Sequence, residues 1–89
     1  MKIKLELFGA SREFSNKDYL EFEIKEKTEI KDFRKELTNY LEKNFKGNDN
    51  FRKIVETSAF CTEDNDIIND NYKISKDQKI GIIPPIGGG

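Results

Sequence analysis

The chain contains no histidine and only one cysteine, Cys61, among its 89 residues. Without histidine it lacks the usual general base of enzymes and the commonest zinc ligand of proteins. A lone cysteine can form neither an intrachain disulfide nor a cysteine–histidine nucleophilic pair, and it is consistent with a reducing compartment. The sequence therefore gives little support for self-contained catalysis, and we expect this chain to bind no metal and no cofactor.

Long apolar runs and an excess of charge of one sign are also missing. No apolar run approaches the ~20 residues that a membrane-spanning helix needs, and the N-terminus passes into a strand pattern without the apolar core of a signal peptide. The 16 Lys and Arg residues are balanced by 17 Asp and Glu, for a net charge of −1. Because nucleic-acid binding needs a basic surface, we expect a cytoplasmic protein with no nucleic-acid partner and no membrane partner.

Two stretches near the N-terminus alternate between apolar and polar residues, the period of a half-buried strand. Residues 2–8 place Ile3, Leu5 and Leu7 on one face. Residues 19–25 repeat the pattern with another apolar set on one face: Leu20, Phe22 and Ile24. The short connector between them predicts an antiparallel hairpin.

The segment from Thr28 to Gly47 has the period of an amphipathic helix. Thr28 is a candidate N-cap and Gly47 a candidate C-cap. The apolar positions fall on one helical face, and they are Ile30, Phe33, Leu37, Tyr40, Leu41 and Phe45.

After the helix the pattern predicts shorter elements. Residues 48–58 fit either one helical turn or a short extended piece. Residues 59–62 fit a short strand, and residues 79–83 fit the last strand. The order predicts an α+β fold with a mixed sheet and one main helix packed across one face. We assign one domain to residues 1–83.

The chain ends in Ile83-Pro84-Pro85-Ile86-Gly87-Gly88-Gly89. The two prolines remove backbone donors and stop further pairing in a sheet. A terminal glycine has an unhindered carboxylate, which a narrow cleft can admit in extended form. A glycine-rich end taken alone is more often a frayed terminus. We assign residues 84–89 to a flexible tail.

Other candidate sites have simpler explanations. The acidic stretch of residues 63–70 lacks the ligand spacing of a calcium loop, so we expect a solvated loop, with docking of a basic partner left open. Cys61 is expected to be a small buried hydrophobe, and Arg12 and Glu13 a weak surface pair. Strand alternation turns Ile83 outward toward a partner, although packing under the N-terminal strand is an equal alternative.

The two ends of the chain carry a resemblance to a known family. Residues 7–14, Leu-Phe-Gly-Ala-Ser-Arg-Glu-Phe, resemble the first strand and Arg-Glu connector of the small, sulfur-carrier subunit of molybdopterin synthase (the MoaD type). Residues 82–89 resemble the Pro-Pro-Val-x-Gly-Gly terminus of that family, with Ile83 in place of its phenylalanine. The resemblance covers nearly the whole chain and implies a ubiquitin-like β-grasp fold. The stretch from Phe60 to Asp66 departs from the family by being more acidic.

The resemblance also implies a function. Gly89 would be the reacting residue, its carboxylate adenylated by a ubiquitin-activating-like enzyme that uses ATP and Mg and then converted to a thiocarboxylate by a sulfur donor. The sulfur would pass to a pterin precursor on the large subunit of molybdopterin synthase, forming the molybdopterin dithiolene. The residues implied in partner binding are Ile83, Pro84, Pro85, Ile86, Gly87 and Gly88. A ubiquitin-like protein modifier, a tRNA-thiolation carrier and an interaction module with an idle tail remain as alternatives.

Overall fold

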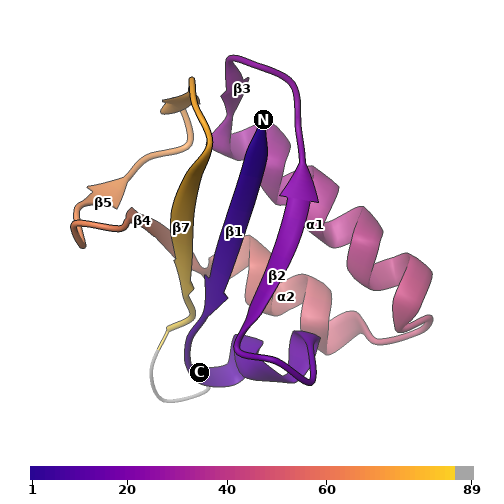
Figure 1. Cartoon of the computed structure of the whole chain (residues 1–89). Helices are drawn as coiled ribbons and strands as arrows, with labels where there is room; N and C mark the ends of the chain where they lie inside the picture. Colours follow the sequence, from indigo (N-terminus) through magenta and orange to yellow (C-terminus); the bar gives the residue numbers. More distant parts are fainter. Residues whose placement is uncertain (86–89) are drawn as a thin grey trace.

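The computed structural model describes residues 1–85, so residues 86–89 lie outside it. Its helices are a 3₁₀ helix, η1 (Gly9–Phe14), and two α-helices, α1 (Ile30–Asn44) and α2 (Asp49–Thr57). Its strands are β1 (Lys2–Leu7), β2 (Tyr19–Glu23), β3 (Thr28–Glu29), β4 (Ala59–Thr62), β5 (Ile67–Ile68), β6 (Lys73–Ile74) and β7 (Gln78–Ile83). Figure 1 shows both α-helices behind the sheet, on one side of it.

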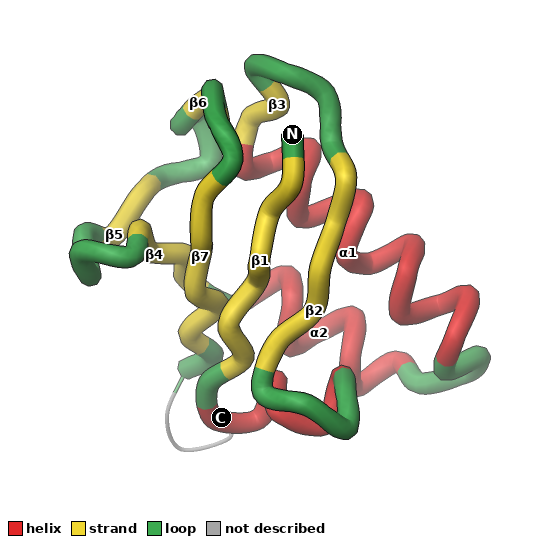
Figure 2. The backbone as a smooth tube through the Cα atoms, viewed as in Figure 1, coloured by secondary structure: helices red, strands yellow, loops and turns green. Residues whose placement is uncertain are grey.

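Five strands form the main sheet in the order β2-β1-β7-β4-β5. β1 and β2 pair as the antiparallel hairpin that the sequence predicts. β7 lies beside β1 and runs parallel to it, whereas β4 pairs with β7 and with β5 in antiparallel fashion. β3 and β6 form a separate two-stranded sheet. The α+β fold with a mixed sheet and a main helix across one face is confirmed (Figure 2).

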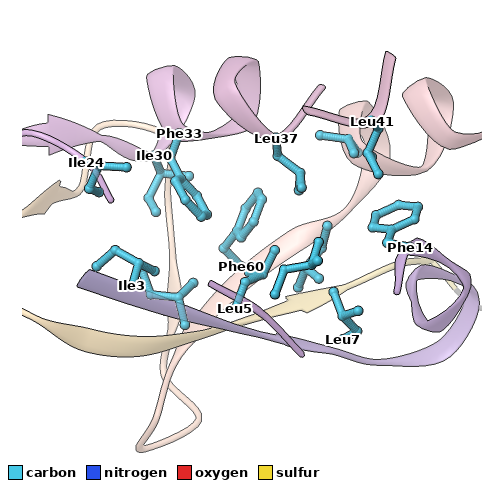
Figure 3. Close-up of a cluster of buried hydrophobic side chains, with 14 of the residues drawn as sticks. Ile3, Leu5, Leu7, Phe14, Ile24, Ile30, Phe33, Leu37, Leu41 and Phe60 are labelled. Carbon is cyan, nitrogen blue, oxygen red and sulfur yellow. The ribbon is translucent and has the colours of Figure 1, made fainter. Parts of the chain in front are cut away.

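The core lies between the helices and the inner face of the sheet (Figure 3). α1 contributes one buried side chain per helical turn, from Ile30 to Leu41. Phe33 packs edge-on against Phe60 of β4, with 6.0 Å between ring centroids. The inward residues of the central strands are fully buried, and they are Ile3, Leu5, Leu7, Ile80 and Ile82. The alternating pattern in the sequence thus identified the inner face correctly.

The predicted limits of the main helix were wrong at both ends. Thr28 is not the N-cap, because it lies in β3 and pairs there with Ile74 of β6. Its hydroxyl donates to the Lys25 carbonyl at 2.7 Å. Gly47 is not the C-cap; α1 ends at Asn44, and Gly47 has a φ of +81° in the following turn. The segment left open at 48–58 is the helix α2, whose first turn is capped by the Asn48 side chain.

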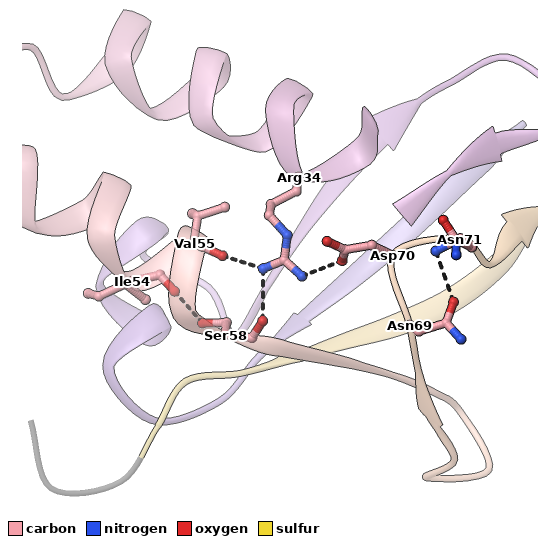
Figure 4. Close-up of polar contacts among 7 residues, drawn as sticks. All are labelled: Arg34, Ile54, Val55, Ser58, Asn69, Asp70 and Asn71. Atoms are coloured by element: carbon pink, nitrogen blue, oxygen red, sulfur yellow. Dashed lines mark hydrogen bonds and ion pairs between the residues drawn. The ribbon is translucent and has the colours of Figure 1, made fainter. Parts of the chain in front are cut away.

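Arg34 of α1 fixes α2 to the rest of the molecule (Figure 4). Its guanidinium donates to the backbone carbonyls of Val55 at 2.6 Å and Ser58 at 2.8 Å, just where α2 ends. It also pairs with the Asp70 carboxylate at 2.7 Å. Because carbonyls at a helix C-terminus lack intrahelical partners, these charged hydrogen bonds both cap α2 and hold it in place.

Candidate functional site at the root of the tail

Because β1 and β7 run parallel, both end at the same end of the sheet, where β1 continues into η1 and β7 into Pro84 (Figure 2). Pro84 is buried. A Cβ added to Gly9 would lie only 3.8 Å from Cδ of Pro84, and Gly9 has a φ of +55°, which favours glycine. The first tail residue is thus packed against the first turn of η1. We call Pro84 and Pro85 the tail root.

Phe8 and Cys61 cover the β7 backbone at Gly81 on the outer face of the sheet. A Cβ at Gly81 would lie 2.8 Å from Cys61 Sγ and 2.9 Å from Cε2 of Phe8. Both distances are shorter than van der Waals contact, so the Phe8 ring lies over β7 only because residue 81 has no side chain. Cys61 is itself buried, with only 4% of its surface exposed.

An exposed apolar surface surrounds this contact. Strand register places Ile67 beside Cys61, Cys61 beside Gly81, and Ala59 beside Ile83, all on the outer face. We call Phe8, Cys61, Ile67, Gly81 and Ile83 the outer apolar patch. Its large members are 43% (Phe8), 65% (Ile67) and 37% (Ile83) exposed. Of the two positions left open for Ile83, the outward one is observed.

The other half of the outer face is polar, and some of its charged side chains are paired with one another. Lys79 forms an ion pair with Glu6 at 2.8 Å, and this hydrogen bond raises the pKa of the Lys79 ammonium group. The Lys4 ammonium group lies 4.3 Å from the centroid of the Tyr19 ring. These contacts engage Lys79, Glu6 and Lys4, so this half of the outer face is polar, in contrast to the apolar patch beside it.

Cys61 is a small buried hydrophobe, as predicted. Burial raises the pKa of its thiol, so the thiol stays protonated at neutral pH and is a poor nucleophile. Within residues 1–85 no group of three or more acidic or cysteine side chains is placed to hold a metal ion. No helix in this part of the chain is both long and apolar enough to cross a membrane.

The remaining sequence candidates are dispersed. Arg12 and Glu13 are exposed on η1, and they form no ion pair with each other. Within the acidic stretch, Asp70 belongs to the Arg34 contact, and the β4–β5 turn is organised by the Thr62 hydroxyl, which accepts from the backbone N–H groups of Asp64 and Asp66. The roles predicted for Ile86, Gly87, Gly88 and Gly89 concern residues outside the described part of the chain, so they stay predictions.

Sequence reasoning missed Phe8 and Gly81. The signal for Phe8 was present, since one more step of alternation after Leu7 places it on the outer face. The requirement for glycine at position 81 had no local signal, because the atoms that enforce it come from β4 and from the end of β1.

A mixed sheet crossed by a main helix, with its central strand leading into a Pro-Pro terminus, defines a ubiquitin-like β-grasp domain. The sequence matches the model of the ThiS family over residues 5–89, so the chain belongs to the ThiS family of ubiquitin-like sulfur carriers. No protein of curated function matches the sequence.

Solved structures share the fold at low sequence identity. A protein provisionally named molybdopterin converting factor, subunit 1, from Pyrococcus furiosus has a TM-score of 0.69 at 16% identity, over 96% of this chain and 98% of that one. SAMP1 from Haloferax volcanii has a TM-score of 0.69 at 14% identity, over 100% of both chains. The ubiquitin of Caldiarchaeum subterraneum has a TM-score of 0.62 at 16% identity, over 100% of this chain and 98% of that one. At these identities the likeness shows the fold alone.

Proposed function

We propose that this chain is a sulfur carrier that acts as the small subunit of molybdopterin synthase, with the Gly89 carboxylate as its reacting group. The observation that carries the proposal is the arrangement of residues at the C-terminal end of β7. A buried central strand leads directly into Pro84 and Pro85, and an exposed apolar patch lies beside that exit. Such an arrangement suits a domain that docks on a partner while its terminus enters the partner's active site.

The chemistry follows from the carboxylate. A carboxylate is a poor electrophile, because its oxygen is a poor leaving group. Attack of a Gly89 oxygen on the α-phosphate of ATP releases pyrophosphate and gives an acyl-adenylate. A sulfur donor at the oxidation level of hydrosulfide then attacks the acyl carbon, the bond from that carbon to the phosphate oxygen breaks, AMP leaves, and a thiocarboxylate results. The activating enzyme supplies ATP and Mg, so we propose that this chain binds no cofactor of its own.

The geometry limits how far the partner can be. The six residues from Pro84 to Gly89 span at most ~20 Å in extended form. Glycines at 87 and 88 add no side chains that would block a narrow channel. The proposed partners are the large synthase subunit, a ubiquitin-activating-like adenylating enzyme and a sulfur donor, all acting in the cytoplasm.

Intact-mass analysis tests the proposal. The full chain is incubated with the ubiquitin-activating-like enzyme of the same organism, ATP, Mg and a sulfur source. We expect the mass change of one oxygen-to-sulfur exchange, and fragmentation should place it at Gly89. The control chain lacks Gly88 and Gly89 and should not change. An unchanged mass of the full chain, with an enzyme active on ATP, contradicts the proposal.

A protein modifier is the second candidate, since this chain shares its fold with SAMP1 and with the ubiquitin of Caldiarchaeum subterraneum. It shares the adenylation step, as would a carrier for tRNA thiolation, so the mass experiment does not separate them. Isopeptide adducts of Gly89 on lysine side chains in cells would support the modifier. Loss of molybdopterin alone after deletion of the gene would support the synthase subunit.

A further inference from the structure

A groove lies beside the tail root on the helix side of the sheet, opposite the outer apolar patch. Its volume is about 280 Å³, room for several water molecules at ~30 Å³ each. Its lining residues are Ala10 of η1, Asn50, Lys53, Ile54 and Thr57 of α2, and the two tail-root prolines. The tail root thus has a potential contact surface on each side.

The α2 side of the groove is one continuous helix face, since its four residues follow the spacing i, i+3, i+4, i+7. Half-buried Ile54 provides an apolar floor together with the buried Pro84. Lys53 is exposed at the edge. Arg52 is engaged by Asp49 and Glu42, whereas within residues 1–85 no carboxylate lies at ion-pair distance from Lys53. Lys53 is therefore the cation that this groove offers.

The length of the tail forces a partner close to this surface. Pro84 is buried against its own domain, so the reach of the terminus is set by the four residues after Pro85, a length of chain that spans at most ~14 Å. An enzyme that encloses the Gly89 carboxylate has to bring the mouth of its channel within that distance of Pro85. Because a channel surrounds the chain that enters it, its mouth approaches the groove as well as the outer apolar patch.

We propose that this groove receives a segment of the channel mouth of the adenylating enzyme, with an apolar side chain on Ile54 and Pro84 and a carboxylate paired with Lys53. The inference rests on the proposed function in one respect, since both require Gly89 to enter a partner's active site. It adds a second contact surface, on α2, to the apolar patch on the sheet. Arg34 holds α2 in position for this contact.

The test measures the steady-state adenylation of the full chain by the purified ubiquitin-activating-like enzyme of the same organism. The rate is monitored as the release of pyrophosphate. Lys53→Glu places like charges in contact, so we expect about a tenfold rise in KM with kcat unchanged. Lys53→Arg should keep KM within about twofold, because the charge is retained. The matched control is Lys25→Glu, which makes the same charge change between β2 and β3, away from the tail root. It should also stay within about twofold, since its charge faces no partner.

The outcomes separate the inference from the proposed function. Wild-type adenylation with an unchanged KM for Lys53→Glu overturns the inference and leaves the carrier function standing. A lower KM for Lys53→Glu also overturns it, because that result means that the groove holds the chain's own tail. A wild-type chain that is not adenylated at all overturns both. A rise in KM that shrinks with added salt and is absent in the Lys25→Glu control supports the inference.

Discussion

The two faces of the main sheet are built from the same alternating strands but differ in what covers them. On the inner face Leu5 and Leu7 are buried beneath the helices (Figure 3), and Ile82 is fully buried as well. On the outer face one half is polar, and the other half is apolar and open at Phe8, Ile67 and Ile83. An exposed apolar patch contributes nothing to packing in a monomer, and such patches commonly mark interaction sites. The inner face therefore accounts for folding, and we propose that the outer face contacts a partner.

Strand β7 shows this difference residue by residue. The side chains of Ile80 and Ile82 point inward and are fully buried. Gly81 and Ile83 occupy the outward positions of the strand. Substitutions at neighbouring positions of one strand should thus change different properties. Four predictions test this contrast.

The largest effect is expected from Leu5→Ala on the inner face. Leu5 is fully buried, so the loss of its side chain removes contacts and leaves a cavity that costs about 2–5 kcal/mol of unfolding free energy. Urea denaturation measures the loss. The control on the outer face of the neighbouring strand, Glu21→Ala, should change stability by less than about 0.5 kcal/mol. Equal losses in the two variants would show that the faces do not differ in this way.

Gly81→Ala should give the next largest effect, because the outer face is closely packed at this one point. The new methyl group would meet Cys61 Sγ and the Phe8 ring. We expect a loss of about 1–2 kcal/mol, near the low end for overpacking, since Phe8 can move toward solvent. The double variant Gly81→Ala/Cys61→Ala removes the closer contact and should show a smaller penalty for the added methyl than the wild-type background does. If the penalty for Gly81→Ala is the same in the Cys61→Ala background, the strain does not come from the contact with Cys61.

Ile83→Thr should affect recognition more than folding. Ile83 is partly exposed on the outer apolar patch, so stability should change by less than about 0.5 kcal/mol. If the patch contacts the adenylating enzyme, KM should rise by up to about tenfold, equivalent to ~1.4 kcal/mol of lost binding. Ile83→Leu keeps the apolar surface and should behave as wild type. A stability loss as large as that of Leu5→Ala would mean that Ile83 belongs to the core.

The smallest effect concerns the pH dependence due to Cys61. Burial raises the pKa of its thiol, so the unfolded chain loses this proton at a lower pH than the folded chain does. This contribution to stability is complete below the unfolded pKa, near 8.5, and is lost as the pH rises through the folded pKa. Denaturation at pH 7 to 10 should show a steeper decline for wild type than for Cys61→Ala. Parallel curves would show that the thiol is not desolvated.

Local patterns predicted most of the fold because they report which side of an element is buried. Alternation identified the inward residues of β1 and β2, and the period of 3.6 identified the buried face of α1. The ends of α1 were wrong because local signals compete with tertiary pairing, and Thr28 pairs with β6 instead of capping the helix. α2 was ambiguous because its nine residues are too short for periodicity to distinguish the alternatives.

The candidate site divides in the same way. The Pro-Pro-Ile-Gly-Gly-Gly terminus could be read from the sequence, whereas the direction of Ile83 was left open between two positions. The packing of Gly9 near Pro84, the position of Phe8 over Gly81 and the groove beside α2 could not, because each joins residues that are far apart in the chain.

The sequence alone determined the alternation of the strands, the amphipathic face of α1 and the chemical nature of the terminus, because these depend on residues that are neighbours along the chain. Only the tertiary structure decided where the tail begins and what lies around it. The parallel pairing of β7 with β1 brings the end of the last strand to η1, and the packing of Pro84 there leaves the tail root between an apolar patch and a groove. That arrangement depends on contacts between the two ends of the chain, which form only when the whole sheet is assembled.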